Sequence, residues 1–298
     1  MKVLLTGATG FFGSHIAEAL CDGGYDLLLT KRKASDIWRC ANFHNKVRWV
    51  DSDTDDFEGV VMDFAPDAVI NSAWGGVLSS ERGDWSEQIK NIDFQQQLLD
   101  ISLKSGVKRF IAIGSQAEYG IINEYARECD KANPVTAYGA VKLAASDILR
   151  SFCIVNGIEW YWFRLFSVFG EREGELWLIP SIIKRFMNGE DIDATEGEQR
   201  YAYLYVGEAA EIVKAALITD EPSGVYNISS DKSITIRELI NSVRDLVNPS
   251  TKINFGAIHY RDGQSMFVAG DMSKTDKIYK PDTSGFEIML KRVVDYYK

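Results

Sequence analysis

Cysteine, histidine and long apolar runs are scarce in this sequence, and each shortage excludes a class of protein. With three histidines among 298 residues and no C-x-x-C pair, we expect neither a metal centre nor a disulfide framework. No apolar stretch approaches the roughly 18 residues of a membrane span, and the start, MKVLLTGATG, is unlike a secretory signal. We therefore expect a cytoplasmic protein that does not cross a membrane. The scattered cysteines are Cys21, Cys40, Cys129 and Cys153.

Basic residues are in the minority. Lys and Arg number 33 against 43 Asp and Glu, which gives a net charge of −10, and the longest basic run is Lys31-Arg32-Lys33. Because an acidic surface repels nucleic acids and anionic membranes, neither is an expected partner. The remaining composition, 46% hydrophobic and 26% charged, is typical of a globular protein with a sizeable core.

Short aliphatic runs alternate with longer helix-like segments through the first 165 residues. This alternation predicts an α/β fold, a doubly wound parallel sheet with helices on both faces. The two longest helices are predicted over Trp85–Ser105 and Thr136–Asn156, the second after Asn133-Pro134. The predicted strands are Val3–Thr6, Asp26–Thr30, Val47–Val50, Ala68–Asn71, Arg109–Ile113 and Glu159–Arg164.

The pattern becomes looser from Phe166 onward, where helices are separated by turns rich in Gly, Pro and Asp. We expect residues 1–165 to form a nucleotide-binding domain, completed by a return segment near residues 205–220. Residues 166–298 are expected to form most of a smaller, irregular domain. The helices predicted there are Ile179–Asn188, Glu208–Thr219, Ile236–Leu246 and Phe286–Tyr297.

Three glycines, Gly7, Gly10 and Gly13, separate the first predicted strand from a helix that begins near Phe12. Glycines at this place let the backbone turn tightly and approach a pyrophosphate, toward which the helix amides point. The spacing is G-x-x-G-x-x-G, which differs from the simplest dinucleotide fingerprint, G-x-G-x-x-G. A turn without function is the alternative, but the position after the first strand favours a dinucleotide site.

The second predicted strand ends in basic residues, whereas a site for NAD usually has an acid there that binds the ribose hydroxyls. Lys31 and Arg32 are suited instead to the 2′-phosphate of NADP, with Arg32 as a bidentate partner. A solvated basic loop is the alternative. Asp51, after the third strand, is either an acceptor for the adenine amino group or a turn residue.

Tyr138 is the one tyrosine that has a lysine four residues later, Lys142, and on a helix this spacing places both side chains on one face. A protonated lysine lowers the pKa of a nearby phenol, which makes the tyrosine a usable proton donor. Ser115 follows the fifth predicted strand, at the carboxyl end where open parallel sheets bind ligands. Its hydroxyl can hydrogen-bond a substrate carbonyl while Tyr138 moves the proton.

In this order, Thr6-Gly7-x-x-Gly10-x-x-Gly13, Ser115 and Tyr138-x-x-x-Lys142 resemble the extended short-chain dehydrogenase/reductase superfamily over nearly the whole chain. Other segments resemble its nucleotide-sugar branch, the NAD(P)-dependent epimerase/dehydratase family. The resemblance implies a Rossmann-like fold in which a nucleoside-diphosphate sugar lies between two domains and exchanges hydride with a nicotinamide. The additional segments are Asn71-Ser72-Ala73, Asn91, Arg164-Leu165-Phe166-Ser167-Val168-Phe169-Gly170 and Gln199-Arg200 with Tyr205-Val206-Gly207-Glu208.

The resemblance assigns catalysis to Ser115, Tyr138 and Lys142. It implies NADP(H) as the cofactor when combined with the basic strand end, with NAD(H) as the alternative. The cofactor contacts that we expect are Gly7, Thr9, Gly10, Phe11, Phe12, Gly13, Lys31, Arg32, Asp51, Ser72, Ala73, Trp74, Asn91, Tyr138 and Lys142.

Substrate contacts are expected from both predicted domains. Arg200 and Arg261 match positions at which the family binds the diphosphate, although a surface salt bridge is the alternative for each. Trp74 is expected beside the nicotinamide and the sugar, or else fills the core. Gln116 and Glu118 either bind sugar hydroxyls or only shape their loop.

The residues after Ser115 indicate which of the family's reactions this chain can catalyse. Members that dehydrate sugars have two carboxylates directly after the hydroxyl residue, whereas Gln116 and Ala117 follow here and Glu118 takes part only after a register shift. Members that epimerise through enol intermediates, such as GDP-fucose synthase, need a second acid/base pair. The matching positions here are Ala117 and Trp177, which carry no proton. The simplest remaining reaction is reduction of a keto sugar.

Two segments resemble reductases of deoxysugar pathways, Gly114-Ser115-Gln116-Ala117-Glu118-Tyr119-Gly120 and Tyr260-Arg261-Asp262-Gly263-Gln264. The sequence therefore predicts an NADPH-dependent oxidoreductase that reduces a keto group, at C4, of a nucleoside-diphosphate 4-keto-6-deoxy sugar. An NAD-dependent nucleotide-sugar 4-epimerase or 4-dehydrogenase is the alternative, and a non-catalytic cofactor-sensing protein is a remote one. Because relatives pair through the two long helices, we expect a homodimer.

Overall fold

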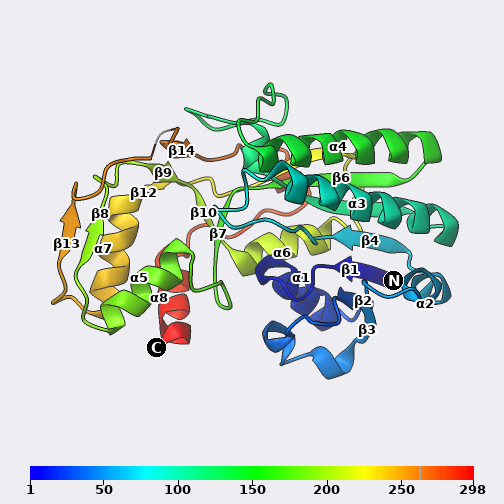
Figure 1. The fold of residues 1–298 in the computed structure, drawn as a ribbon, viewed down its shortest axis with the longest axis horizontal. Coiled ribbons are helices and arrows are strands. Elements are labelled where there is room, and N and C mark those ends of the chain that lie inside the picture. The colour runs from blue at the N-terminus through cyan, green and yellow to red at the C-terminus, as the bar shows by residue number, and fades with distance from the viewer. Residues whose placement is uncertain (262) are drawn as a thin grey trace.

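A computed structural model describes residues 1–261 and 263–298, and Figure 1 shows two lobes of unequal size. The larger, here called the sheet lobe, is built on seven parallel strands in the order β11-β6-β5-β4-β1-β2-β3. The chain runs outward from β1 to β3 and then returns to β4 on the other side of β1, which creates a topological switch point. The strands are β1 Lys2–Thr6, β2 Asp26–Lys31, β3 Arg48–Asp51, β4 Ala68–Asn71, β5 Arg109–Ser115, β6 Glu159–Leu165 and β11 Gly224–Ile228.

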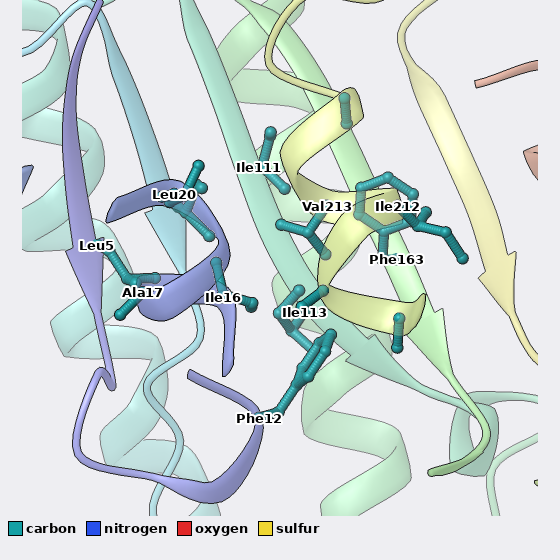
Figure 2. Packing of buried hydrophobic residues seen from close by; sticks show 14 of the residues in the cluster. Leu5, Phe12, Ile16, Ala17, Leu20, Ile111, Ile113, Phe163, Ile212 and Val213 are labelled. Carbon is teal, nitrogen blue, oxygen red and sulfur yellow. The ribbon is translucent and has the colours of Figure 1, made fainter. Parts of the chain in front are cut away.

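Helices cover both faces of the sheet because successive side chains of each buried strand point to opposite sides. On one face, α1 (Phe11–Asp22) and α6 (Val206–Ala215) pack side by side on the central strands. Figure 2 shows Ile16 of α1 and Val213 of α6 over Ile113 of β5. This packing fixes the start of α1 beside the end of β1.

Three helices cover the other face of the sheet, α2 (Phe57–Phe64), α3 (Trp85–Ser105) and α4 (Ala137–Asn156). Both long helices begin at a side chain that caps their free amides: Asp84 accepts from the second and third residues of α3, and Thr136 accepts from the Gly139 amide. The start of α4 is thereby held near the carboxyl ends of the strands.

The second lobe, here called the small lobe, packs three helices around its own apolar core. Ile183, Leu239 and Val293, one from each helix, are fully buried at its centre. Short strands complete the lobe and connect it to the sheet lobe. Its helices are α5 Leu178–Met187, α7 Ile236–Val247 and α8 Phe286–Tyr297. Two small sheets have two strands each: β7 Ser167–Phe169 with β10 Tyr203–Tyr205, and β8 Ile192–Ala194 with β13 Ile253–Phe255. A third has three strands: β12 Ile234–Thr235, β9 Arg200–Tyr201 and β14 Phe267–Val268.

The chain crosses between the lobes more than once. After the first turn into the small lobe, α6 and β11 lie on the sheet lobe, where β11 pairs with β6 as the edge strand. Met272 packs in the same core, whereas α7 before it and α8 after it belong to the small lobe. The lobes are therefore interleaved along the chain.

A buried polar network around Arg172, in the segment between β7 and α5, joins the lobes. Its guanidinium donates to the His15 Nδ1 atom at 2.8 Å and to the Glu18 carboxylate, both on α1, and to the Arg39 carbonyl at 2.7 Å. Arg172 has a φ of +67°, a conformation that costs a non-glycine residue free energy. Burial and the Arg172 charge lower the pKa of His15 to about 4, so its ring is neutral at pH 7.

The predicted doubly wound parallel sheet is confirmed, and β4 and α3 have the predicted bounds. Two elements of the sheet lobe were not predicted, α2 and β11. The α2 segment is short and follows the acidic run Asp51–Asp56, which is typical of a loop. Gly224–Ile228 adopts a strand conformation because it pairs with β6, and the local sequence does not predict this pairing.

Candidate active site

The glycine loop between β1 and α1 has no room for side chains. Gly7 has a φ of +71°, and a Cβ on it would lie 2.6 Å from backbone atoms of Ser72 and Ala73. A Cβ on Gly13 would lie 2.0 Å from the Gly7 carbonyl oxygen. Gly10 caps α1 without a side-chain hydrogen bond, so no side chain of the cap covers the first amides of the helix. This close-packed turn at a helix N-terminus fits a pyrophosphate.

Neighbouring side chains hold the glycine loop in place. Thr6 donates its hydroxyl to Asn71 Oδ1 at 2.7 Å and accepts the Ala73 amide at 3.3 Å, which links the ends of β1 and β4. Phe12 is packed in the core, so its predicted cofactor contact can involve only its backbone. Gly7, Thr9 and Phe11 of this loop are half-buried.

The basic end of β2 is partly neutralised by its neighbour. Lys31 forms an ion pair with Asp51 at the end of β3. The structure thus pairs two residues for which the sequence predicted separate cofactor contacts, and the Lys31 charge is already compensated. Arg32 is exposed, and within residues 1–261 and 263–298 its guanidinium has no hydrogen bond or ion pair. Arg32 is therefore available to a phosphate, as is the neighbouring exposed Lys33.

Two side chains of α3 fix the loop that follows β4. Asn91 accepts the Gly75 amide at 2.7 Å and donates to the Gly75 carbonyl at 3.3 Å. Gln88 is fully buried and accepts the Trp74 indole N–H at 2.9 Å. Both ends of the Asn91 amide bind protein backbone, so Asn91 positions the loop that carries Trp74, and its predicted contact with the cofactor stays a prediction.

Ser115, Tyr138 and Lys142 lie together at the carboxyl end of the sheet. Ser115 is the last residue of β5, and the other two lie one turn apart at the start of α4. All three are buried, with exposed fractions of 8%, 7% and 4%. The Lys142 ammonium donates to the Ile113 carbonyl of β5 at 2.6 Å, which anchors α4 to the strand that carries Ser115.

Burial raises the pKa of Tyr138 above its usual value, because the phenolate is poorly solvated there. The Arg82 guanidinium and the Ser115 hydroxyl both lower this pKa, whereas Glu118 raises it further. Arg82 lies 4.9 Å from the centre of the Tyr138 ring. Arg82 is thus a cation beside Tyr138 that the sequence analysis did not identify and that favours the phenolate.

Aromatic rings surround the Lys142 ammonium. It lies 3.6 Å from the centre of the Trp74 ring, 5.9 Å from that of Trp162 and 6.0 Å from that of Tyr138. Burial lowers the pKa of Lys142, and the charge of Glu118 raises it. Trp74 was predicted to lie beside the nicotinamide and sugar, and its ring lies next to the two catalytic candidates on α4.

Glu118 has no exposed surface, which corrects its predicted contact with sugar hydroxyls. One carboxylate oxygen accepts the Ser115 amide at 2.8 Å and the Trp162 indole N–H at 2.9 Å. The other accepts Arg164 Nε at 2.7 Å. Because these partners occupy both oxygens, Glu118 is also unavailable as the acid of a dehydration reaction.

The remaining predicted substrate contacts lie at the surface. Gln116 is half-buried in the 3₁₀ turn directly after Ser115. Arg200 is exposed and donates to the Ser233 carbonyl at 2.8 Å, and Arg261 is also exposed. The resembling segment around Arg261 includes Asp262, which lies outside the described residues.

Sequence reasoning missed Arg82, which joins the catalytic candidates to the small lobe. Its carbonyl accepts the Tyr138 amide at 3.0 Å, and its guanidinium donates to the Val77 carbonyl at 2.9 Å. The guanidinium also lies 5.8 Å from the centre of the Trp177 ring, at the start of α5. Arg82 belongs to a polar loop of ordinary surface composition, so no local signal distinguishes it.

Two classes of feature are absent from the described part of the chain. Its His, Cys, Asp and Glu residues form no group of three or more that could hold a metal ion. None of its helices combines the length and the apolar character needed to cross a membrane.

Comparison with known proteins places these features in a family. The sequence model of the NAD dependent epimerase/dehydratase family matches residues 3–229. Low-salt glycan biosynthesis protein Agl12 of Haloferax volcanii is 29% identical, over 100% of this chain and 98% of its own. CDP-abequose synthase of Salmonella muenchen is 27% identical, over 89% of this chain and 87% of its own.

A solved structure resembles the whole fold. The UDP-N-acetylglucosamine 4-epimerase of Methanobrevibacter ruminantium, in complex with UDP-N-acetylmuramic acid, superposes with a TM-score of 0.90 at 28% identity. The likeness covers 99% of this chain and 97% of that one. Both lobes therefore have counterparts in a protein that acts on a nucleotide sugar.

Proposed function

The chain belongs to the NAD dependent epimerase/dehydratase family, and from this premise we propose that it reduces the C4 keto group of a nucleoside-diphosphate 4-keto-6-deoxy sugar with NADPH. The family accounts for a dinucleotide-dependent reaction on a nucleotide sugar. The choice of reduction within the family depends on the residues around Ser115.

The environment of Ser115 is the observation that carries this proposal. Gln116 and Ala117 follow it, where a dehydratase needs carboxylates, and Arg164 holds the nearby Glu118 in a buried ion pair. No acid in this turn is left to protonate a leaving hydroxyl. A serine, a tyrosine and a lysine suited to hydride exchange remain, so reduction is the simplest chemistry of the site.

The glycine loop fits the dinucleotide, since a pyrophosphate can approach the Gly7 and Gly13 backbones where a Cβ would block it. When bound, NADPH supplies the hydride. Arg32 is proposed to hold the 2′-phosphate, because Asp51 already neutralises Lys31.

In the proposed reaction, the Ser115 hydroxyl donates a hydrogen bond to the keto oxygen and polarises the carbonyl. Hydride forms the new C–H bond, the π electrons of the C=O bond move to oxygen, and that oxygen takes the phenolic proton of Tyr138. The products are the alcohol and a Tyr138 phenolate, which the Lys142 ammonium stabilises until a solvent proton restores the phenol.

Cofactor titration tests this proposal first. We expect the protein to bind NADPH more tightly than NADH, and Arg32→Ala to weaken NADPH binding selectively, by about tenfold for the loss of one charged contact. Arg48→Ala is the matched control, because Arg48 is an exposed cation at the opposite end of its strand. The purified protein should then consume NADPH with 4-keto-6-deoxy sugar nucleotides. Copurified NAD, with no preference for NADPH, contradicts the assignment.

An NAD-dependent 4-epimerase is the second candidate, and the comparison with the Methanobrevibacter ruminantium 4-epimerase favours it. Such an enzyme uses the same serine, tyrosine and lysine to oxidise and reduce one carbon. Interconversion of C4 epimers of a UDP-sugar, without net consumption of NADPH, identifies this activity. The same assay separates it from a 4-dehydrogenase, which reduces added NAD.

We also propose that residues 1–165 with α6 and β11 bind the cofactor and that the small lobe binds the nucleotide sugar, with Arg200 and Arg261 on its diphosphate. Gln116 and Trp74 are proposed to contact the sugar. Replacement of each arginine by Ala is expected to raise KM for the nucleotide sugar and to leave the Kd of NADPH unchanged.

A homodimer through α3 and α4 is part of the proposal. Ile89 and Leu103 on α3, and Ile154 and Val155 on α4, are apolar yet 48% to 81% exposed. Two copies that pair these helices would cover this surface. Val155→Glu is expected to convert a dimer into a monomer in sedimentation equilibrium, and a monomeric wild-type protein contradicts this part.

A further inference from the structure

The buried carboxylate of Glu118 lies behind the proposed catalytic groups rather than among them. It has no exposed surface, and its oxygens accept hydrogen bonds from the Ser115 amide, the Trp162 indole and Arg164 Nε. Such a group cannot touch a substrate. It can act only through the residues that it holds.

The backbone around Ser115 is built to admit this carboxylate. Ser115 caps the 3₁₀ turn Gln116–Glu118, accepting the Ala117 amide at 3.1 Å while Glu118 accepts the Ser115 amide. A Cβ on Gly114 would lie 2.5 Å from the carboxylate and 2.1 Å from the Trp162 indole nitrogen. Gly114 therefore leaves space for Glu118 directly beneath Ser115.

Trp162 connects Glu118 to the lysine. Its indole N–H donates to Glu118, and its ring lies 5.9 Å from the Lys142 ammonium. The charged and titratable groups around Lys142 are Tyr138 on its own helix, Glu118 after β5, Arg164 on β6 and Arg82 before α3. Among these groups Glu118 carries the one carboxylate.

We propose that Glu118 is a positioning residue of the active site, which fixes Ser115 through its amide and serves as the buried counter-charge of Lys142. This inference rests on the proposed roles of Ser115 and Lys142. A carboxylate in a poorly solvated interior stabilises a nearby ammonium strongly, because little water screens the attraction. Consistent with this, Glu118 raises the pKa of Lys142, which burial lowers.

Loss of the Glu118 carboxylate should lower the pKa of both Lys142 and Tyr138. Glu118 raises the pKa of Lys142 and also that of Tyr138. Without its charge, the ammonium and the phenol both lose their protons at lower pH. Since reduction needs both protons, the alkaline limb of the rate profile should move to lower pH.

The experiment compares pH profiles of kcat and of NADPH binding for Glu118→Gln, which keeps the shape and removes the charge. We expect the alkaline limb of both profiles to move down by about one pH unit. Glu128→Gln is the matched control: Glu128 is a half-buried carboxylate that accepts the Asn227 amide away from Lys142, and its profile should not move. A folded Glu118→Gln protein with unshifted profiles overturns the proposal.

A second variant covers the case in which Glu118→Gln does not fold, because it leaves Arg164 as an unpaired buried charge. The double variant Glu118→Gln with Arg164→Met removes both charges, and because loss of the Arg164 cation offsets part of the effect, its alkaline limb should move to lower pH by less than about one unit. An unshifted limb in the double variant overturns the proposal as well. Absence of ketoreduction in the wild type disproves the proposed function alone, because the binding profile still reports on Lys142.

Discussion

Arg82 is a single side chain that brings a positive charge to the buried Tyr138. The guanidinium stabilises the phenolate, so its removal should raise the Tyr138 pKa, the opposite of the effect expected for Glu118. We predict that Arg82→Gln moves the alkaline limb of kcat against pH to higher pH, by about half a unit to one unit. The measurement is the rate of keto reduction from pH 6 to about 11.

Arg82→Lys provides the control for this prediction, because it retains the cation without the planar guanidinium. Its alkaline limb should lie between those of the wild type and of Arg82→Gln. A loss of activity at every pH with an unchanged limb would assign Arg82 a purely structural role in the loop before α3.

Glu173 is a buried carboxyl group whose Oε2 atom has no hydrogen-bond partner among the described residues. Burial raises its pKa to about 8, against 4.5 when exposed. Between these two values the unfolded chain loses the proton and the folded protein keeps it, so stability falls as pH rises from 4.5 to about 8. We predict that Glu173→Gln removes this loss, which amounts to about 5 kcal/mol.

Denaturant unfolding at pH 5 and at pH 8.5 gives the change in the free energy of unfolding with pH. The Glu173 effect is the difference in this change between the wild type and Glu173→Gln. The pH-independent cost of burying the amide cancels in this comparison. Glu198→Gln replaces an exposed carboxylate and should show the same change in unfolding free energy with pH as the wild type. A wild-type protein that gains stability toward pH 8 would disprove the assignment.

At the residue scale, the sequence predicted which catalytic candidates lie together, but it did not predict the charged groups that pack around them. Ser115, Tyr138 and Lys142 follow from a motif whose spacing sets their geometry on a helix and at a strand end. The burial of Glu118 and the stacking of Arg82 on Tyr138 depend on contacts between distant segments. Such contacts leave no periodic pattern in the chain.

At the scale of the element, the turn from β1 into α1 tolerates no side chain at Gly13. A Cβ there would lie 2.0 Å from the Gly7 carbonyl, so the helix must move away from the strand. We predict that Gly13→Ala destabilises the protein by about 3 kcal/mol and weakens NADPH binding at least about tenfold. Thermal unfolding and cofactor titration measure the two effects.

Gly285→Ala is the matched control for Gly13→Ala. Gly285 precedes α8 with a negative φ, and nothing lies within 4 Å of the position of an added Cβ. Its stability and cofactor affinity should equal those of the wild type. Equal behaviour of the two variants would show that the loop adapts to a methyl group.

Elements with strong local signals were predicted, and those created by tertiary pairing were not. The helix α3 combines an aspartate cap with a long sequence of helix-forming residues, and its bounds were predicted from sequence. The strand β11 contains Gly224 and Asn227, which disfavour strands, and exists because it pairs with β6. Its membership in the sheet is a property of the whole fold.

At the scale of the whole molecule, Arg172 connects α1 to the segment that leads into the small lobe. Arg172→Ala removes its bonds to His15, Glu18 and the Arg39 carbonyl and keeps the strained backbone. We predict that Arg172→Ala lowers the free energy of unfolding by about 3 kcal/mol. Arg172→Gly should be about 1 kcal/mol more stable than Arg172→Ala, since glycine adopts a positive φ freely.

Thermal unfolding of the two Arg172 variants, side by side, measures this difference. If both match the wild type, the network does not stabilise the junction between the lobes. If Gly and Ala are equally destabilising, the backbone at residue 172 is not strained.

The interleaving of the two lobes along the chain restricts how this protein can exchange parts with its relatives. A single recombination point after β6 would separate the sheet from its edge strand β11 and from α6, which covers one of its faces. Exchange of the small lobe would therefore need separate replacements of the segments from β7 to β10, from β12 to β14 and of α8. Because the chain visits the two lobes in alternation, the small lobe cannot be exchanged as one continuous segment.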